Sequence, residues 1–197
     1  MARYFLVHKP YGVLSQFTRE EEHHRTLADL FDFPPTVYPV GRLDRDSEGL
    51  LLLTDDRRLN AALLSPAYRR QKTYWVRVEG TPTSEQITRL RTGVEFRAKK
   101  KQYRSAPARV RLLSAAETAG IDPRVPPVRF RKSVPDAWLE LIITEGKNRQ
   151  VRRMCAAVGL PVLRLIRVAL SGVELSDLEG TQVREFDASW LLPRLGV

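Results

Sequence analysis

The pattern of apolar and polar positions predicts short elements of both kinds, with strands in the majority. Alternating or continuous apolar runs are typical of strands. Such runs cover Arg3–His8, Val13–Phe17, Leu50–Leu53, Lys72–Val78, Ala108–Leu113, Ala137–Thr144, Val162–Val168, Ser171–Leu175 and Thr181–Phe186. Most of them are separated by links of hairpin length, which favours an α+β fold on a mixed, largely antiparallel sheet. We expect two lobes around a shared cleft.

Capping residues and helix stops predict the helices between these strands. Thr83 and Gln86 match a capping box for a helix that reaches about Thr92 and ends at Gly93. The other expected helices are Leu27–Phe31 after Thr26, a helix carrying Leu59, Ala62 and Leu63 after Thr54 or Asp55, Glu145–Val158 with Asn148 as its cap, and Ala188–Leu195.

Four consecutive leucines, Leu50–Leu53, indicate a strand that is buried on both faces. The polar segment Gly41–Gly49, GRLDRDSEG, comes directly before them. We therefore expect this segment at the rim of the core. A proline-rich stretch between Ala115 and Asp136 has little periodicity and predicts an ordered surface excursion or a mobile loop, not a domain boundary.

Length and charge narrow the class of protein. A chain of 197 residues is in the range of one compact domain, which we expect to span residues 1–197. Its net charge of +10 comes mainly from arginine, which favours a polyanionic partner such as RNA or DNA. Cys155 is the single cysteine, so a disulfide within the chain and a thiolate metal site are excluded. With no long apolar run, we expect a cytoplasmic protein with no membrane segment.

Three acids alternate at Asp44, Asp46 and Glu48 before a glycine, as at the start of a calcium-binding loop. The match fails because Glu stands at the fifth position and four leucines fill the second half of the loop. Paired carboxylates could also hold magnesium in a nuclease. Arg42 and Arg45 oppose a metal, whereas a carboxylate flanked by cations is well suited to act as a nucleophile or general base. We therefore expect no metal.

Four stretches follow one another along the chain: HKPYGVLS (His8–Ser15), GRLDRDSEGLLLLTDD (Gly41–Asp56), KTYWV (Lys72–Val76) and EGKNRQVRRM (Glu145–Met154). In this order they resemble the motifs of the RsuA-type ribosomal RNA pseudouridine synthases. The resemblance extends across most of the chain and implies the pseudouridine synthase fold. Many members carry a small RNA-binding domain before the first motif. We expect no such domain here, because the opening strand starts at Arg3. In this respect the chain resembles the short RluE-like subgroup, which acts on large-subunit ribosomal RNA. The segment VPPVRFRKS (Val125–Ser133) also resembles that subgroup.

The resemblance also implies residue roles. Asp44 would be the nucleophile, Tyr74 the aromatic residue against the target base, and Arg152 the cation that pairs with the aspartate. A flipped-out nucleotide would need basic side chains on its flanking phosphates. The candidates are Lys9, Arg42, Lys72, Lys147, Arg149 and Arg153. This chemistry requires no metal and no organic cofactor.

Two rival functions remain open at this point: a non-catalytic RNA-binding protein and a metal-dependent nuclease. Weaker signals also have two interpretations. His23 and His24 lie in the charged run EEEHHR, which we interpret as a pH-insensitive surface loop and not as a metal site. Lys99–Lys101 with Tyr103 and Arg104 could bind RNA backbone or form a solvated hairpin. No pattern indicates an obligate interface, so we expect a monomer.

Overall fold

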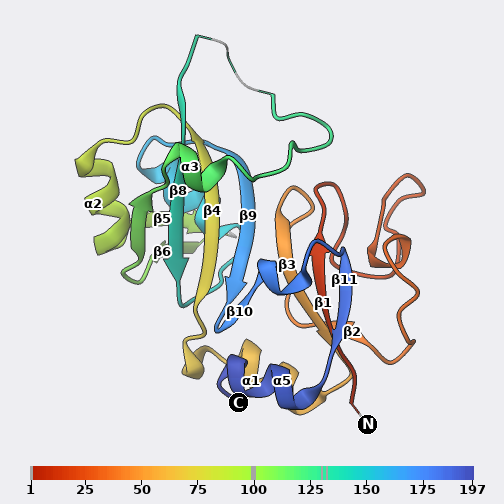
Figure 1. Ribbon diagram of the computed structural model, residues 1–197. Coiled ribbons are helices and arrows are strands. Elements are labelled where there is room, and N and C mark those ends of the chain that lie inside the picture. Colours follow the sequence, from red (N-terminus) through yellow and green to blue (C-terminus); the bar gives the residue numbers. More distant parts are fainter. Residues whose placement is uncertain (1, 99–100, 130, 132) are drawn as a thin grey trace. The chain divides into compact units, whose positions relative to one another are not determined.

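The computed structural model describes residues 2–98, 101–129, 131 and 133–197. The chain forms two compact units. The terminal unit contains residues up to 70 together with residues 166–197, and the central unit contains residues 71–165. The boundary falls within β9 (Val162–Leu170). Both units combine helices with mainly antiparallel strands (Figure 1), which confirms the predicted α+β class.

In the terminal unit, β1 (Tyr4–Lys9) is antiparallel to both β11 (Val183–Phe186) and β3 (Glu48–Thr54). Two short strands extend the pairing: β2 (Tyr38–Pro39) on β3 and β10 (Val173–Glu174) on β9. β3 is parallel to β9, with Glu48 opposite Ile166 and Gly49 opposite Arg167. This parallel pair makes the sheet mixed, as predicted.

β3 is buried along its whole length, as its four leucines predict. On one face, Leu50 and Leu52 join a core cluster with leucines of α1 (Arg57–Leu64) and α5 (Ala188–Leu195). These two helices lie side by side in Figure 1. On the other face, Phe5 of β1 contacts the rings of Phe31 and Phe33, with centroids 6.0 and 5.5 Å away. Apolar residues on both sides therefore account for the uninterrupted run.

In the central unit, β4 (Lys72–Glu79) pairs antiparallel with β8 (Asp136–Ile143), and β8 pairs with β7 (Arg109–Leu112). A separate hairpin consists of β5 (Glu95–Ala98) and β6 (Lys101–Arg104). Tyr74, Val76 and Val78 share the buried face of β4, in agreement with the predicted alternation. The two longer helices of the central unit are α2 (Ser84–Thr92) and α4 (Gln150–Ala157).

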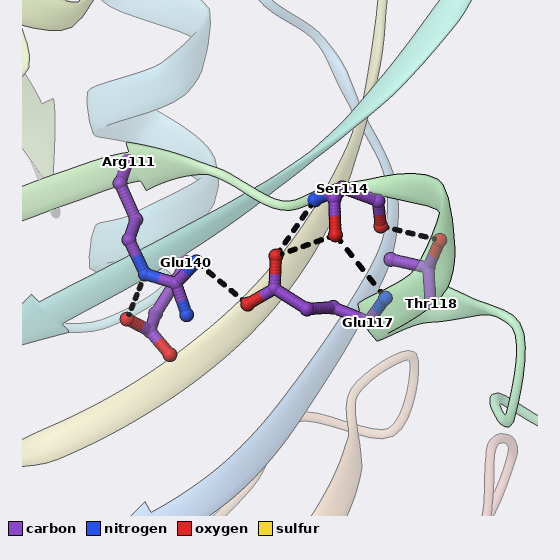
Figure 2. Close-up of polar contacts among 5 residues, drawn as sticks. All are labelled: Arg111, Ser114, Glu117, Thr118 and Glu140. Carbon is purple, nitrogen blue, oxygen red and sulfur yellow. Dashed lines mark hydrogen bonds and ion pairs between the residues drawn. The ribbon is translucent and has the colours of Figure 1, made fainter.

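The proline-rich excursion begins with the short helix α3 (Ala115–Thr118). Figure 2 shows how a network of polar contacts holds this turn to the sheet. Glu117 accepts from the backbone N–H of Ser114 at 2.8 Å and from Arg111 at 2.7 Å, and Arg111 also donates to Glu140. The Ser114 backbone bond, followed by the Arg111 bond, lowers the pKa of Glu117 to about 2.

The predicted strand Val13–Phe17 is wrong. Only Val13 forms an isolated bridge, to Arg25, and the segment is otherwise irregular. Its apolar side chains pack from a loop: the Phe17 ring lies edge-on to Phe33 and Tyr38, with centroids 5.7 and 6.3 Å away. The alternation therefore reflects burial of loop side chains and not a sheet ladder.

Two predicted helix caps need correction, whereas the Thr83–Gln86 capping box is confirmed. Asp56 caps α1 through bonds from the N–H groups of Arg58 and Leu59, and Thr54 supports it by accepting the Asp56 N–H. Arg149 precedes α4 with a left-handed φ of 52°, while Asn148 accepts from Arg153 instead. Thr26 begins a 3₁₀ helix, η1 (Leu27–Asp29); the others are η2 (Pro66–Tyr68) and η3 (Leu175–Leu178).

Across the part of the chain that the structure describes, no helix is both long and apolar enough to cross a membrane.

Candidate active site

Asp44 lies half-buried in the turn that leads into β3. The turn is closed by a bond from the Ser47 N–H to the Asp44 carbonyl at 3.0 Å. Gly49 follows with a φ of +106°, and a Cβ there would collide with the backbone of Arg167. Only glycine therefore allows the chain to enter β3 this close to β9.

Residues on both sides of Asp44 are held by the segment that carries the first motif. The buried Ser15 hydroxyl donates to the Leu43 carbonyl at 2.8 Å and accepts the Leu43 N–H at 3.1 Å. The Gly12 N–H donates to the Arg45 carbonyl at 2.8 Å. Asp44 thus sits between two anchored neighbours. These bonds give His8–Ser15 a structural reason to accompany the aspartate turn, and the sequence pattern alone did not reveal Ser15.

Lys9 does not offer its charge to a phosphate, contrary to the sequence-based expectation. It is 0% exposed, and its ammonium donates to the carbonyls of Pro10 at 2.9 Å and Val13 at 2.7 Å. Burial lowers the pKa of Lys9 to about 8, although Glu48, Asp46 and Asp44 oppose the shift. Because the ammonium is buried and bonds to backbone carbonyls, its role is to hold the start of the first motif.

Arg42 keeps its place among the candidate phosphate contacts. Its side chain is exposed and donates to Gln16 Oε1 at 3.1 Å. Of the nearby acids, Glu48 is buried within β3. Among the described residues, the one group with three close metal-ligating atoms consists of Glu21, His23 and His24.

The segment that carries His23 and His24 is a loop, as predicted, but the His24 side chain is buried, with 8% exposure. Its Nε2 lies 3.0 Å from Nη1 of Arg45, the residue that follows Asp44. His23 is exposed.

In the central unit, Tyr74 lies on the buried face of β4 and is 8% exposed. Lys72 precedes it on the same strand, and its Cε lies 3.8 Å from the position that a Cβ on Gly146 would take. The turn before α4 therefore packs beside the start of β4. Tyr74 and the third motif belong to the same unit.

The third motif builds a tight turn at the start of α4. Gln150 is buried; its side chain accepts the Lys147 N–H at 2.9 Å and donates to Glu145. Glu145 also accepts the Ala106 N–H at 2.9 Å. These two polar residues hold the turn, a role that the sequence analysis missed because their partners are set by the fold. Arg152 is half-buried on α4 and donates to the Val162 carbonyl at 3.3 Å.

The remaining candidate cations surround this turn. Lys147 is exposed, with its Nζ 4.8 Å from the centre of the Tyr103 ring. Arg153 donates to the Arg97 carbonyl on β5, which ties α4 to the β5–β6 hairpin. Arg149 is half-buried. The structure thus brings together Lys72, Lys147, Arg149 and Arg153. Lys99 and Lys100 lie outside the described residues; Tyr103 and Arg104 form β6 of the expected hairpin.

Cys155 is fully buried on α4, as its place on the apolar face of the predicted helix indicated. Burial raises the pKa of its thiol to about 12, so the group stays protonated and serves as core.

Charge is divided unequally between the units. Residues 71–165 contain 20 Lys and Arg against 8 Asp and Glu, a net charge of +12. The remaining residues contain 13 against 15, a net charge of −2. The central unit therefore accounts for the basic character of the whole chain.

The structure places an aspartate between anchored residues in a turn, within an α+β fold that has one arginine-rich unit. Comparison of the sequence with known families identifies the class of protein that has these features. Residues 3–157 match the family model described as RNA pseudouridylate synthase. The chain therefore belongs to the RNA pseudouridylate synthase family, and its enzyme class is that of isomerases that make pseudouridine.

Particular relatives narrow this assignment. The chain is 54% identical over 189 residues to "Ribosomal large subunit pseudouridine synthase E" of Xanthomonas campestris pv. campestris, covering 95% of this chain and 97% of the relative. It is 47% identical to the protein of the same name from Vibrio vulnificus, covering 91% and 73%. A solved structure titled "Crystal structure of pseudouridylate synthase" matches with a TM-score of 0.77 at 28% identity, over 99% of this chain and 74% of that one. These similarities confirm the family and the fold that the four motifs imply.

Proposed function

We propose that this chain converts a specific uridine of large-subunit ribosomal RNA to pseudouridine, with Asp44 as its covalent catalyst. The observation that carries the role of Asp44 is its place between two anchored residues, Leu43 and Arg45, in the motif that defines the family. The relatives named as large-subunit enzymes support the choice of RNA.

The reaction exchanges one glycosidic bond for another. The bond between ribose C1′ and uracil N1 breaks, the base turns, and C1′ bonds to C5 of the same base. The proton on C5 leaves to solvent while N1 gains one, so no oxidant or cofactor is consumed. A carboxylate at the sugar or the base can assist the departure of the uracil, as the nucleophile of a retaining glycosidase does. Asp44 supplies that carboxylate.

Two residues of the central unit complete the proposed catalytic set. Tyr74 stacks on the detached uracil and keeps it from leaving while it turns. Arg152 pairs with the Asp44 carboxylate and keeps it ionised and oriented. In this proposal both units act on one nucleotide, so that residues 1–197 work as a single catalytic domain.

The RNA on either side of the flipped nucleotide is held by Arg42 in the terminal unit and by the cations around the α4 turn. The charge of +12 on residues 71–165 supports this assignment, because phosphate contacts dominate the affinity of proteins for nucleic acids. The cations of the α4 turn are Lys72, Lys147, Arg149 and Arg153.

The protein is further proposed to act as a monomer in the cytoplasm, without a metal or an organic cofactor. Sedimentation equilibrium over a wide concentration range measures the first point. A mass that stays at that of one chain supports the monomer, and a concentration-dependent doubling opposes it.

Tritium release from large-subunit ribosomal RNA labelled at C5 of uridine tests the function as a whole. We expect release with RNA of unchanged length, and the same rate in the presence of a chelator. Shortened RNA, or loss of activity on chelation, would favour a metal-dependent nuclease. RNA binding without release by folded protein would favour a non-catalytic RNA-binding protein.

A further inference from the structure

A buried histidine in the terminal unit has no part in the proposed chemistry, yet it contacts the residue beside Asp44. His24 Nε2 lies 3.0 Å from Arg45 Nη1. A guanidinium only donates hydrogen bonds, so Nε2 must accept this one. The contact therefore requires a neutral imidazole that carries its proton on Nδ1.

The same contact argues against a metal ion at the cluster of Glu21, His23 and His24. A metal on Nδ1 of His24 would leave the proton on Nε2, pointing at a guanidinium donor. A metal on Nε2 would displace the guanidinium from its place. The arrangement is that of an acceptor for Arg45.

Arg45 is held at two points by the same stretch of chain. Its carbonyl accepts the Gly12 N–H at 2.8 Å, and its guanidinium is fixed by His24. The backbone of His24 is itself fixed, because its main-chain N–H donates to the Glu21 carbonyl at 3.0 Å, and the imidazole ring is buried. Main chain and side chain of Arg45 therefore both restrict how the Asp44 turn can move.

We propose that His24 is a positioning residue: its neutral imidazole holds Arg45, and through Arg45 the turn that orients Asp44, so that isomerisation slows when the imidazole gains a proton. The inference rests on the proposed role of Asp44. Protonation replaces an acceptor by a donor and places two cations together.

Several charged groups surround His24. Arg45 faces its Nε2, and the His23 ring lies 4.6 Å away between ring centres. The Glu21 carboxylate lies 3.4 Å from His23 Nδ1 and is exposed, as is the side chain of Arg25. The exposed His23 is a second imidazole beside His24 and makes no described bond to Arg45, so it serves as the matched control.

The experiment compares His24→Gln, His24→Leu and the control His23→Gln by tritium release across pH. Glutamine keeps an acceptor near the position of Nε2 and does not titrate. We expect His24→Gln to stay within about twofold of wild type at pH 8 and to lose the fall in kcat on the acid side. His24→Leu should lose roughly tenfold or more in kcat at pH 8 with little change in KM. His23→Gln should keep the wild-type profile.

A double substitution tests whether His24 acts through Arg45. If it does, His24→Leu combined with Arg45→Leu should lose no more activity than the larger single effect. Additive losses would overturn the inference, as would an acid limb in His24→Gln identical to that of wild type. Because the His24→Gln profile is read on an active enzyme, poor folding of the leucine variant does not prevent a decision.

Asp44→Asn, measured in parallel, separates this inference from the proposed function. If Asp44→Asn is inactive and His24→Leu is as fast as wild type, only the role of His24 is overturned. If Asp44→Asn is active, the proposed function of Asp44 fails whatever the His24 variants do.

Discussion

At the scale of single residues, Lys9 shows how a charge can serve the site from inside the core. The sequence placed it among phosphate contacts because it is a lysine in a family motif. In the fold it is fully buried, and it donates to the carbonyls of Pro10 and Val13. Residue type alone could not distinguish these outcomes, because burial depends on the strands that pack around β1.

Lys9 predicts how stability changes at alkaline pH. Its pKa is 10.5 in the ordinary case and about 8 in the fold, so between these values the unfolded chain binds a proton that the folded chain has lost. The penalty for burying the charge is therefore present below about pH 8 and disappears as pH rises towards 10.5. The free energy of unfolding of wild type should therefore rise with pH in this window. Its slope against pH should exceed the slope of Lys9→Met by up to the value for the release of one proton.

Urea denaturation at a series of alkaline pH values measures this difference. Parallel curves for wild type and Lys9→Met would contradict the burial of a titrating lysine.

At the scale of elements, patterns within a short stretch of sequence correctly predicted features that depend on neighbouring residues alone. The leucine run located β3, the alternation located Tyr74 on the buried face of β4, and a capping box located α2. Contacts distant in sequence were not predictable in this way. Val13–Phe17 looks like a strand because its side chains are buried, but Ser15 bonds to Leu43, which is 28 residues away. The same limit applies to His24 and to Gln150, whose polar partners exist only in the fold.

Ser15 gives a prediction at this scale. Ser15→Ala leaves the N–H and the carbonyl of Leu43 without their buried partner, which costs about 1–3 kcal/mol. Because Leu43 precedes Asp44, kcat for tritium release should fall at least tenfold, by roughly the amount that a small misplacement of a catalytic group costs. Circular dichroism during urea denaturation measures stability, and tritium release measures kcat.

Thr83→Ala is the matched control, because it removes the cap of α2 in the central unit and costs about 1 kcal/mol. It should leave kcat unchanged in the folded enzyme. Equal losses of kcat in the two variants would mean that stability, and not the position of Asp44, decides activity.

At the scale of the whole molecule, the basic charge predicted from composition belongs to one unit. Composition gives the total of +10, but its division into +12 and −2 depends on a boundary inside β9 that no local pattern marks. The family and the fold class could be predicted from four motifs, and the same motifs propose the residues of the candidate site. The anchors of the Asp44 turn and the location of the charge required the fold.

Because the positive charge lies mainly in the central unit, we expect the salt dependence of RNA binding to come mainly from cations of that unit. Arg97 and Arg104 are exposed on the β5–β6 hairpin, next to Lys147 and its Tyr103 partner. The double variant Arg97→Gln and Arg104→Gln should weaken RNA binding, and the slope of log K against log salt should become shallower by about one to two. Filter binding at several salt concentrations measures both quantities.

The control replaces Arg57 and Arg69 by Gln, which removes the same charge from exposed positions in the terminal unit. We expect little change in its slope. Equal changes in the two double variants would indicate that only the net charge of the molecule matters.

The most direct test of the account concerns Asp44 itself. Wild-type protein and Asp44→Asn are compared by tritium release from C5-labelled large-subunit ribosomal RNA, with RNA affinity and unfolding measured on the same samples. Asparagine has nearly the same size but cannot act as a nucleophile, so the account predicts full release by wild type, none above background by Asp44→Asn, and similar RNA binding and stability. Release by a folded Asp44→Asn at the wild-type rate would contradict it.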